Sequence, residues 1–188
     1  MNPNSRIHGP IRASITCAAS AGSMSSLALG STTPPTASSA WTYYETIPGG
    51  AGASPQAPGE SAIQTHMTNT LNTPAEALEM QYPLRVRRFE LAQNTGGLGL
   101  HPGGHAIIRE LEFLTDVTGT ILSDRRTRRP WGLAGASSGT AGRNTLIKSN
   151  GEEIPLRGKD QFAARAGDRI QIITPGGGGW GAVPVPSR

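Results

Sequence analysis

The chain has 188 residues, enough for one domain with a hydrophobic core and fewer than two full domains usually need. Its net charge is only +4 and is spread without a long run of one sign, which argues against a nucleic-acid-binding protein. No apolar stretch approaches the roughly 20 residues of a membrane-spanning helix, and the single cysteine, Cys17, excludes an internal disulfide.

These features predict a protein of the reducing cytoplasm. An organelle transit peptide is the alternative, because the first acidic residue is Glu45 and the stretch before it is rich in Ser, Thr and Ala and contains Arg6 and Arg12. A divergent, loop-rich segment explains the same composition, so the cytoplasm remains our prediction.

The first 40 residues show little hydrophobic periodicity, and we expect segment 1–40 to be loop-rich and partly disordered. Residues 41–47 (WTYYETI) are aromatic and β-branched and are followed by proline and glycine, which is typical of a strand that ends in a turn. We therefore take residues 41–181 as the folded domain and residues 182–188 as a tail.

Residues 74–80 (PAEALEM) are the strongest helix candidate in the chain. Proline suits the first turn of a helix, and alanine, leucine, glutamate and methionine all favour the helical conformation. The hydroxyl of Thr73 can accept a hydrogen bond from the free backbone N–H groups of a first turn, so we expect Thr73 to cap this helix.

The sequence after this helix alternates with a period of two, which predicts a strand. Leu84 and Val86 lie on one face, and the alternation then shifts phase and continues with Phe89 and Leu91. One extra residue inserted near Arg87 would bring both halves onto the same face. The pattern therefore predicts a strand interrupted by a β-bulge.

Five further strand candidates are separated by turns rich in Gly, Pro, Asn and Asp, namely 106–113, 119–122, 145–148, 161–164 and 169–174. Short strands at this spacing are typical of sandwiches and barrels. We predict a mainly β fold of the α+β class, a β-rich sandwich or barrel-like domain with one or two short helices.

The segment that leads into the helix holds the densest group of side chains able to do chemistry. His66 can act as an acid or a base near neutral pH, and Glu76 is a second catalytic candidate. Thr68, Asn69 and Asn72 offer hydrogen-bond donors and acceptors that suit a small polar substrate. In the alternative interpretation these polar residues tie down a loop, and the glutamate favours the positive end of the helix.

The basic cluster comprises Arg125, Arg126, Arg128 and Arg129. The planar guanidinium group matches carboxylates and phosphates, so Arg125 and Arg126 are candidate substrate-binding residues. Ion pairing with Asp124 or with a partner subunit is the alternative for these arginines.

Glycine clusters at 96–99 (GGLG) and 176–179 (GGGG) can expose N–H groups that hold a carboxylate or an oxyanion, although we prefer to interpret them as turns of a β-rich fold. His101 and His105 have the spacing of a helical metal-binding pair. The intervening Pro102 prevents a helix, so we predict no metal site on this chain.

Long motifs follow one another through most of the chain: YYETI at 43–47, HMTNTLNTPAEALE at 66–79, YPLRV at 82–86, SDRR at 123–126, PWGL at 130–133 and TPGGGGWG at 174–181. In content and order they resemble the hydantoinase B/5-oxoprolinase family, and specifically its carboxy-terminal part. The resemblance implies a component of an ATP-dependent hydrolase that opens hydantoin, 5-oxoproline or a related lactam, and a component that is inactive alone.

The same resemblance implies partners. ATP and a divalent metal are expected on a kinase-like hydantoinase A-type subunit and on the missing amino-terminal hydantoinase B portion, and no cofactor is expected on this chain. The residues agree, because no GxxxxGK[ST] phosphate loop occurs and the nearest approach places Asp160 where it would repel a phosphate. No nucleic-acid or membrane partner is expected.

One block departs from the family pattern, residues 19–27. The family normally carries Gln at the position of Ala21 and amide side chains near Ser25 and Ser26. If those amides orient a substrate, this chain lacks donors that a buried polar ligand needs. The alternative function is therefore a non-catalytic structural or interaction module derived from the family.

Overall fold

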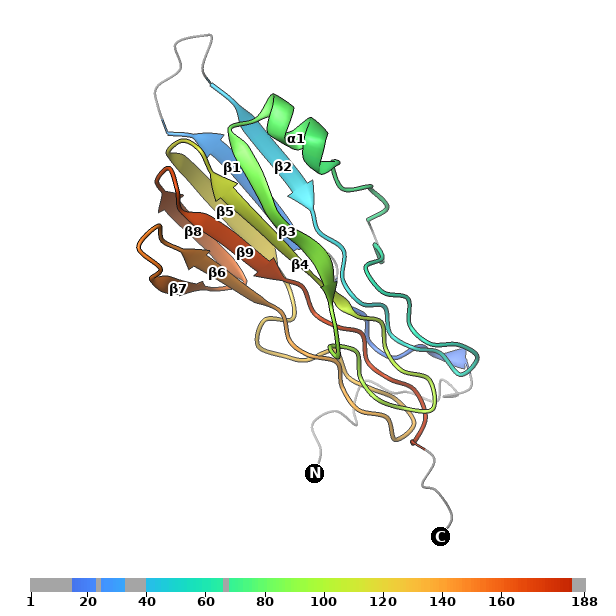
Figure 1. Ribbon diagram of the computed structural model, residues 1–188. Coiled ribbons are helices and arrows are strands. Elements are labelled where there is room, and N and C mark those ends of the chain that lie inside the picture. Colours follow the sequence, from blue (N-terminus) through green and yellow to red (C-terminus); the bar gives the residue numbers. More distant parts are fainter. Residues whose placement is uncertain (1–14, 23–24, 33–39, 66–67, 184–188) are drawn as a thin grey trace.

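The computed structural model describes residues 15–22, 25–32, 40–65 and 68–183, which form two antiparallel sheets and one short helix (Figure 1). The four-stranded sheet has the order β2-β1-β5-β8 and the five-stranded sheet the order β3-β4-β9-β6-β7. The bounds are β1 Ser25–Ser31, β2 Thr42–Thr46, α1 Ala75–Gln81, β3 Leu84–Ala92, β4 Ala106–Phe113, β5 Val117–Ser123, β6 Arg143–Ile147, β7 Glu153–Leu156, β8 Lys159–Ala164 and β9 Arg169–Ile173. The predicted β-rich fold with a short helix is confirmed.

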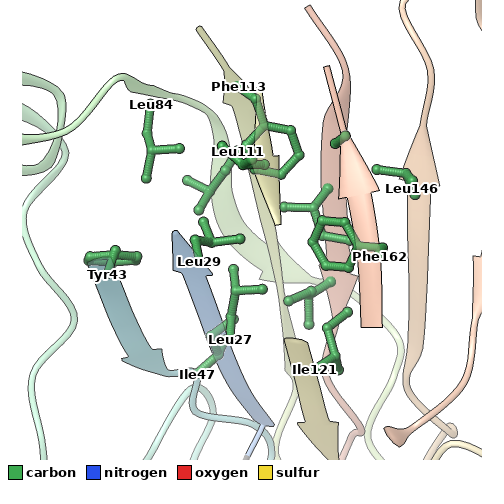
Figure 2. Packing of buried hydrophobic residues seen from close by; sticks show 14 of the residues in the cluster. Leu27, Leu29, Tyr43, Ile47, Leu84, Leu111, Phe113, Ile121, Leu146 and Phe162 are labelled. Atoms are coloured by element: carbon green, nitrogen blue, oxygen red, sulfur yellow. The ribbon is translucent and has the colours of Figure 1, made fainter. Parts of the chain in front are cut away.

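The hydrophobic core lies between the two sheets, and alternate residues of the central strands point into it. Leu27 and Leu29 of β1 face Leu111 and Phe113 of β4 across this core (Figure 2). Phe113 also packs against Phe162 of β8, with ring centroids 6.1 Å apart. Side chains of both sheets therefore interdigitate in one continuous core.

The predicted bulge is present in β3. Val86 pairs with Leu111, and the register then shifts so that Arg88 pairs with Glu110. Because directly paired residues of neighbouring strands share a face, Val86 lies on the inner face and Arg88 on the outer face. The shift returns Phe89 to the inner face, where it pairs with Arg109.

Two strands differ from the sequence expectations. β1 lies inside segment 1–40, expected to be loop-rich, and yet runs between β2 and β5. Its buried Leu27 and Leu29 alternate with small residues, so the strand lacks the β-branched residues that usually reveal one. β7 was missed because it contains Pro155, which the edge of a sheet tolerates. Residues 33–39 lie outside the described part of the chain.

The predicted helix is present as α1, and its buried Leu78 anchors it against β3. The expected cap by Thr73 is wrong, because Pro74 occupies the N-cap position and no side chain caps the helix. At the other end the backbone N–H of Tyr82 donates to the Leu78 carbonyl. No helix within the described residues has the length and apolar character needed to cross a membrane.

Beyond the strand ends, extended segments from distant parts of the chain run together in a bundle (Figure 1). We call this the glycine bundle, and it comprises residues 18–22, 49–53, 95–104, 131–140 and 176–181. Segment 176–181 exchanges backbone hydrogen bonds with all four of the other segments. It is therefore the centre of the bundle.

The bundle requires glycine because its backbones approach one another closely. A Cβ atom on Gly177 would lie 1.7 Å from the carbonyl oxygen of Ala51, and one on Gly104 would lie 1.8 Å from that of Glu60. The N–H groups of residues 176–179 all donate to carbonyl oxygens of neighbouring segments. These glycines therefore make neither the turns that we preferred nor the oxyanion cradle that was the alternative.

Candidate functional site

Several of the predicted site segments meet where the sandwich joins the glycine bundle. Residues 21–22, the start of β1, residues 47–49 directly after β2 and residues 63–65 border a cavity of about 10 Å³ there, room for about one water molecule. We call it the junction cavity, and its lining includes Gly22, Ser25, Gln64 and Thr65. The loop after β5 reaches the same place, because the side chain of Arg126 donates to Ser25.

Polar side chains on both sides of residues 66–67 hold the chain at the end of β2. The side-chain amides of Gln64 and Asn72 both donate to the carbonyl oxygen of Thr46, each at 3.0 Å. The hydroxyl of Thr65 donates to the carbonyl oxygen of Gly22 at 3.3 Å. His66 lies outside the described residues, directly after a residue that lines the cavity.

The remaining candidates of this segment have different environments. Thr68 is half-buried and donates to the carbonyl oxygen of Thr65 at 3.1 Å, whereas the side chain of Asn69 is exposed. Asn72 is half-buried and donates to Oε1 of Glu45 at 2.9 Å. Glu76 is exposed on α1, and α1 contributes no residue to the lining of the cavity. Thr68 is thus hydrogen-bonded to a residue that lines the cavity, whereas Glu76 lies apart from it.

The two arginine candidates point to different partners. Arg126 donates from Nε and Nη2 to Oδ1 of Asn144, from Nη1 to the Asp124 carbonyl oxygen and from Nη2 to Oγ of Ser25. Burial lowers the pKa of Arg126 to about 10, and the charge of Asp124 partly offsets this effect. Arg125 instead lies over the ring of Trp131, 4.5 Å from its centroid. In the described part of the chain, Arg126 donates a hydrogen bond to a side chain of the cavity lining, whereas the guanidinium of Arg125 is directed at Trp131.

A buried ion pair beside this site was missed by sequence reasoning. Nε and Nη2 of Arg109 each lie 3.2 Å from a carboxylate oxygen of Glu45, and both side chains are almost fully buried. The guanidinium also lies 4.7 Å from the ring centroid of Phe89. The available signal was an arginine at an inner-face position of β4, between the core residues Ile107 and Leu111.

The structure also places the residues that bear on the metal and phosphate expectations. No three His, Cys, Asp or Glu side chains gather in this part of the chain into a group that could hold a metal ion. His101 pairs through its backbone with Trp180, and the N–H of His105 donates to the hydroxyl of Ser61. Asp160, the residue expected to repel a phosphate, lies on β8.

The model of the family described as hydantoinase B/oxoprolinase matches residues 7–183. The chain belongs to this family. 5-Oxoprolinase 1 of Arabidopsis thaliana is 46% identical to it over 166 residues, which are 88% of this chain and 13% of that protein. The 5-oxoprolinase of Dictyostelium discoideum is 41% identical over 165 residues, which are 88% of this chain and 12% of that protein.

Among solved structures, the ATP-dependent caprolactamase of Pseudomonas jessenii has the same fold, with a TM-score of 0.71 and 24% sequence identity. The match covers 93% of this chain and 31% of the caprolactamase chain. This member of the hydantoinase B/oxoprolinase family therefore spans less than a third of each of these three proteins.

Part of the block 19–27, which departs from the pattern expected of the family, lies at the junction cavity. Ala21 and Ser25 both line it. Ser26 is placed differently, because its hydroxyl accepts a hydrogen bond from Tyr44 at 3.0 Å. Ala21, the position at which we expect Gln from the family resemblance, thus borders the cavity with a methyl group.

Proposed function

We propose that this chain is a component of an ATP-dependent hydrolase that opens a cyclic amide such as hydantoin, 5-oxoproline or a related lactam. ATP is handled by a separate kinase-like subunit, and the amino-terminal hydantoinase B portion supplies the divalent metal. The observation that carries the proposal is the junction cavity. Its lining residue Ser25 accepts a hydrogen bond from Arg126, and its lining residues Ile47 and Thr65 end one family motif and directly precede another. Membership of the hydantoinase B/oxoprolinase family supports the reaction class.

In this proposal the chain forms one wall of the substrate site. A cyclic amide presents carbonyl acceptors and an N–H donor, which the exposed amide of Asn69 can read by hydrogen bonding. His66, next to the cavity-lining Thr65, is placed in the sequence to exchange a proton with the substrate. The other walls belong to parts of the assembly outside this chain.

A chimera tests the proposal. This chain replaces the matching segment of Arabidopsis 5-oxoprolinase 1, and ATP-dependent opening of 5-oxoproline is measured. We expect kcat/KM within about tenfold of the parent enzyme, because the segments are similar over 166 residues. A version of the parent without this segment serves as the negative control. A chimera that folds and retains ATP hydrolysis but opens no ring would contradict the proposal.

The second candidate, a non-catalytic module derived from the family, is favoured by Ala21, which lines the cavity at the position where we expect Gln from the family resemblance. The variant Ala21→Gln introduces this amide in the chimera and leaves Ser25 in place. Ring opening that appears only in this variant identifies a module that has lost its site. Ring opening by the chimera that is equal with and without the substitution rejects the module and supports the enzyme component.

A further inference from the structure

Ser25 lines the junction cavity, and its hydroxyl group is polarised by Arg126. Nη2 of Arg126 lies 3.2 Å from Oγ of Ser25, and a guanidinium nitrogen only donates, so Ser25 is the acceptor in this hydrogen bond. Among the hydrogen bonds of the described residues, the Ser25 hydroxyl acts only as an acceptor, so its hydrogen is available to a ligand. A hydroxyl that accepts from a cation is a stronger donor to its next partner.

The hydrogen bonds that the structure describes for Arg126 go to neutral groups. They are the side chains of Asn144 and Ser25 and the backbone carbonyl oxygen of Asp124. Asn144 is itself buried and fixed, because it donates to the hydroxyl of Ser123 at 3.1 Å. The guanidinium of Arg126 packs closely against Gly142, where an added Cβ atom would lie 2.7 Å from Nη1.

Arg109, by contrast, faces the carboxylate of Glu45 directly, so its charge is balanced inside the core. The groups to which Arg126 donates are neutral, and the charge of Asp124 offsets only part of the effect of burial on its pKa. A guanidinium in this setting, joined to the cavity through Ser25, favours an incoming negative charge. The cavity of about 10 Å³ has room for one oxygen atom of a ligand whose other atoms extend beyond it.

We infer that Ser25 and Arg126 form an oxyanion-binding couple, in which the Ser25 hydroxyl donates to one ligand oxygen and Arg126 supplies the charge behind it. The inference rests on the proposed function and narrows its substrate class to negatively charged lactams. The oxyanion is either the carboxylate of a lactam acid such as 5-oxoproline or the phosphoryl group of a phosphorylated ring. Both groups offer a negatively charged oxygen that accepts a hydrogen bond from Ser25.

The test uses the chain itself, without ATP or partners. Three probes at matched ionic strength are titrated while the amide signal of Ser25 and the Nε–H signal of Arg126 are followed by NMR: 5-oxoproline, pyrrolidinone and inorganic phosphate. Pyrrolidinone has the same ring without the carboxylate. We expect saturable shifts with 5-oxoproline, with phosphate or with both, and none with pyrrolidinone. Binding of only one anion identifies the source of the oxyanion.

Ser25→Ala should weaken the binding of the anion about tenfold, because one charge-assisted hydrogen bond is lost. Ser26→Ala is the matched control, since its hydroxyl accepts from Tyr44 and should leave the affinity unchanged. Arg126→Lys keeps the charge but loses the fork to Asn144, and it should weaken binding as well. Thermal melting of each variant establishes that it is folded.

Equal shifts with all three probes, no saturable shifts with either anion, or wild-type affinity in folded Ser25→Ala would overturn the couple. Failure of the couple is distinguishable from failure of the proposed function. Anion binding that depends on Ser25, together with a chimera that opens no ring, rejects only the function. Ring opening by a chimera whose Ser25→Ala variant is fully active rejects only the couple.

Discussion

Glu45 of β2 and Arg109 of β4 face each other across the sandwich and join its two sheets through a two-point ion pair. The exposed fraction of the side chain is 3% for Glu45 and 1% for Arg109, so neither charge is hydrated. Glu45 also accepts a hydrogen bond from Asn72. The same carboxylate therefore ties the sheets to one another and to the polar segment beside the junction cavity.

Breaking this pair should destabilise the chain strongly. Arg109→Met leaves the carboxylate of Glu45 buried without its cation, and we expect the free energy of unfolding to fall by about 3 to 5 kcal/mol. Urea denaturation measures the change. In the double variant with Glu45→Gln the loss should be at least about 1 kcal/mol smaller than the sum of the two single losses. Strict additivity would show that the two charges do not stabilise each other.

Gly177→Ala should disrupt the glycine bundle, because the added Cβ atom would overlap the Ala51 carbonyl oxygen at 1.7 Å. The backbones must separate, and we expect a loss of about 3 kcal/mol or more, or no folded protein. Gly30→Ala on β1 is the matched control, since its Cβ atom would meet its nearest neighbour at an ordinary 3.6 Å. Thermal melting compares the two. Similar melting temperatures would contradict the close packing of the bundle.

The paired variants Asn69→Ala and Asn72→Ala separate substrate binding from structural support. In the proposed site the side-chain amide of Asn69 binds the substrate, so its loss should lower kcat/KM of the chimera about tenfold or more. Because this side chain is exposed, its loss should change the free energy of unfolding by less than about 0.5 kcal/mol. Asn72 donates to Glu45 and Thr46, so its loss should reduce stability by about 1 to 2 kcal/mol. Unchanged kinetics in Asn69→Ala would remove Asn69 from the substrate site.

Tyr43 makes the stability of the chain sensitive to alkaline pH. Burial, and then the charge of Glu45, raise the pKa of Tyr43 from 10.0 to about 12. The unfolded chain loses the Tyr43 proton near pH 10, whereas the folded chain retains it. The contribution of Tyr43 to the free energy of unfolding is therefore fully present below pH 10 and is lost as the pH rises towards 12. We expect a loss of about 2 kcal/mol over this interval.

The measurement for Tyr43 is urea denaturation at several pH values between 9 and 12, compared with Tyr43→Phe. The variant carries no ionisable group at this position, so the difference between the two proteins isolates Tyr43 from the other tyrosines and the lysines. A constant difference across the interval would contradict a raised pKa for this phenol.

The strands that sequence analysis predicted best have strong local alternation. β4 has the predicted bounds 106–113, and the phase shift in β3 correctly located the bulge. β1 escaped prediction because its small residues become strand only when β2 and β5 pair with both of its edges. Local propensity carries no information about such partners.

The candidate site was predictable in composition but not in arrangement. The polar segment and the cluster around Arg126 were both evident in the sequence, yet nothing local places Arg126 against Ser25, which is 101 residues away. The pair of Glu45 and Arg109 likewise joins residues 64 positions apart. Long-range pairs of this kind follow from the stacking of the sheets, which periodicity along one strand does not determine.

The glycine bundle also sets the order in which the chain can fold. Its central segment, 176–181, follows all four of its bundle partners in the sequence. Glycine gives up more conformational entropy on ordering than any other residue, and the bundle has few side chains to bury in return. During synthesis on the ribosome, the four earlier segments therefore lack their common partner until residues 176–181 emerge, and the bundle closes as a late step.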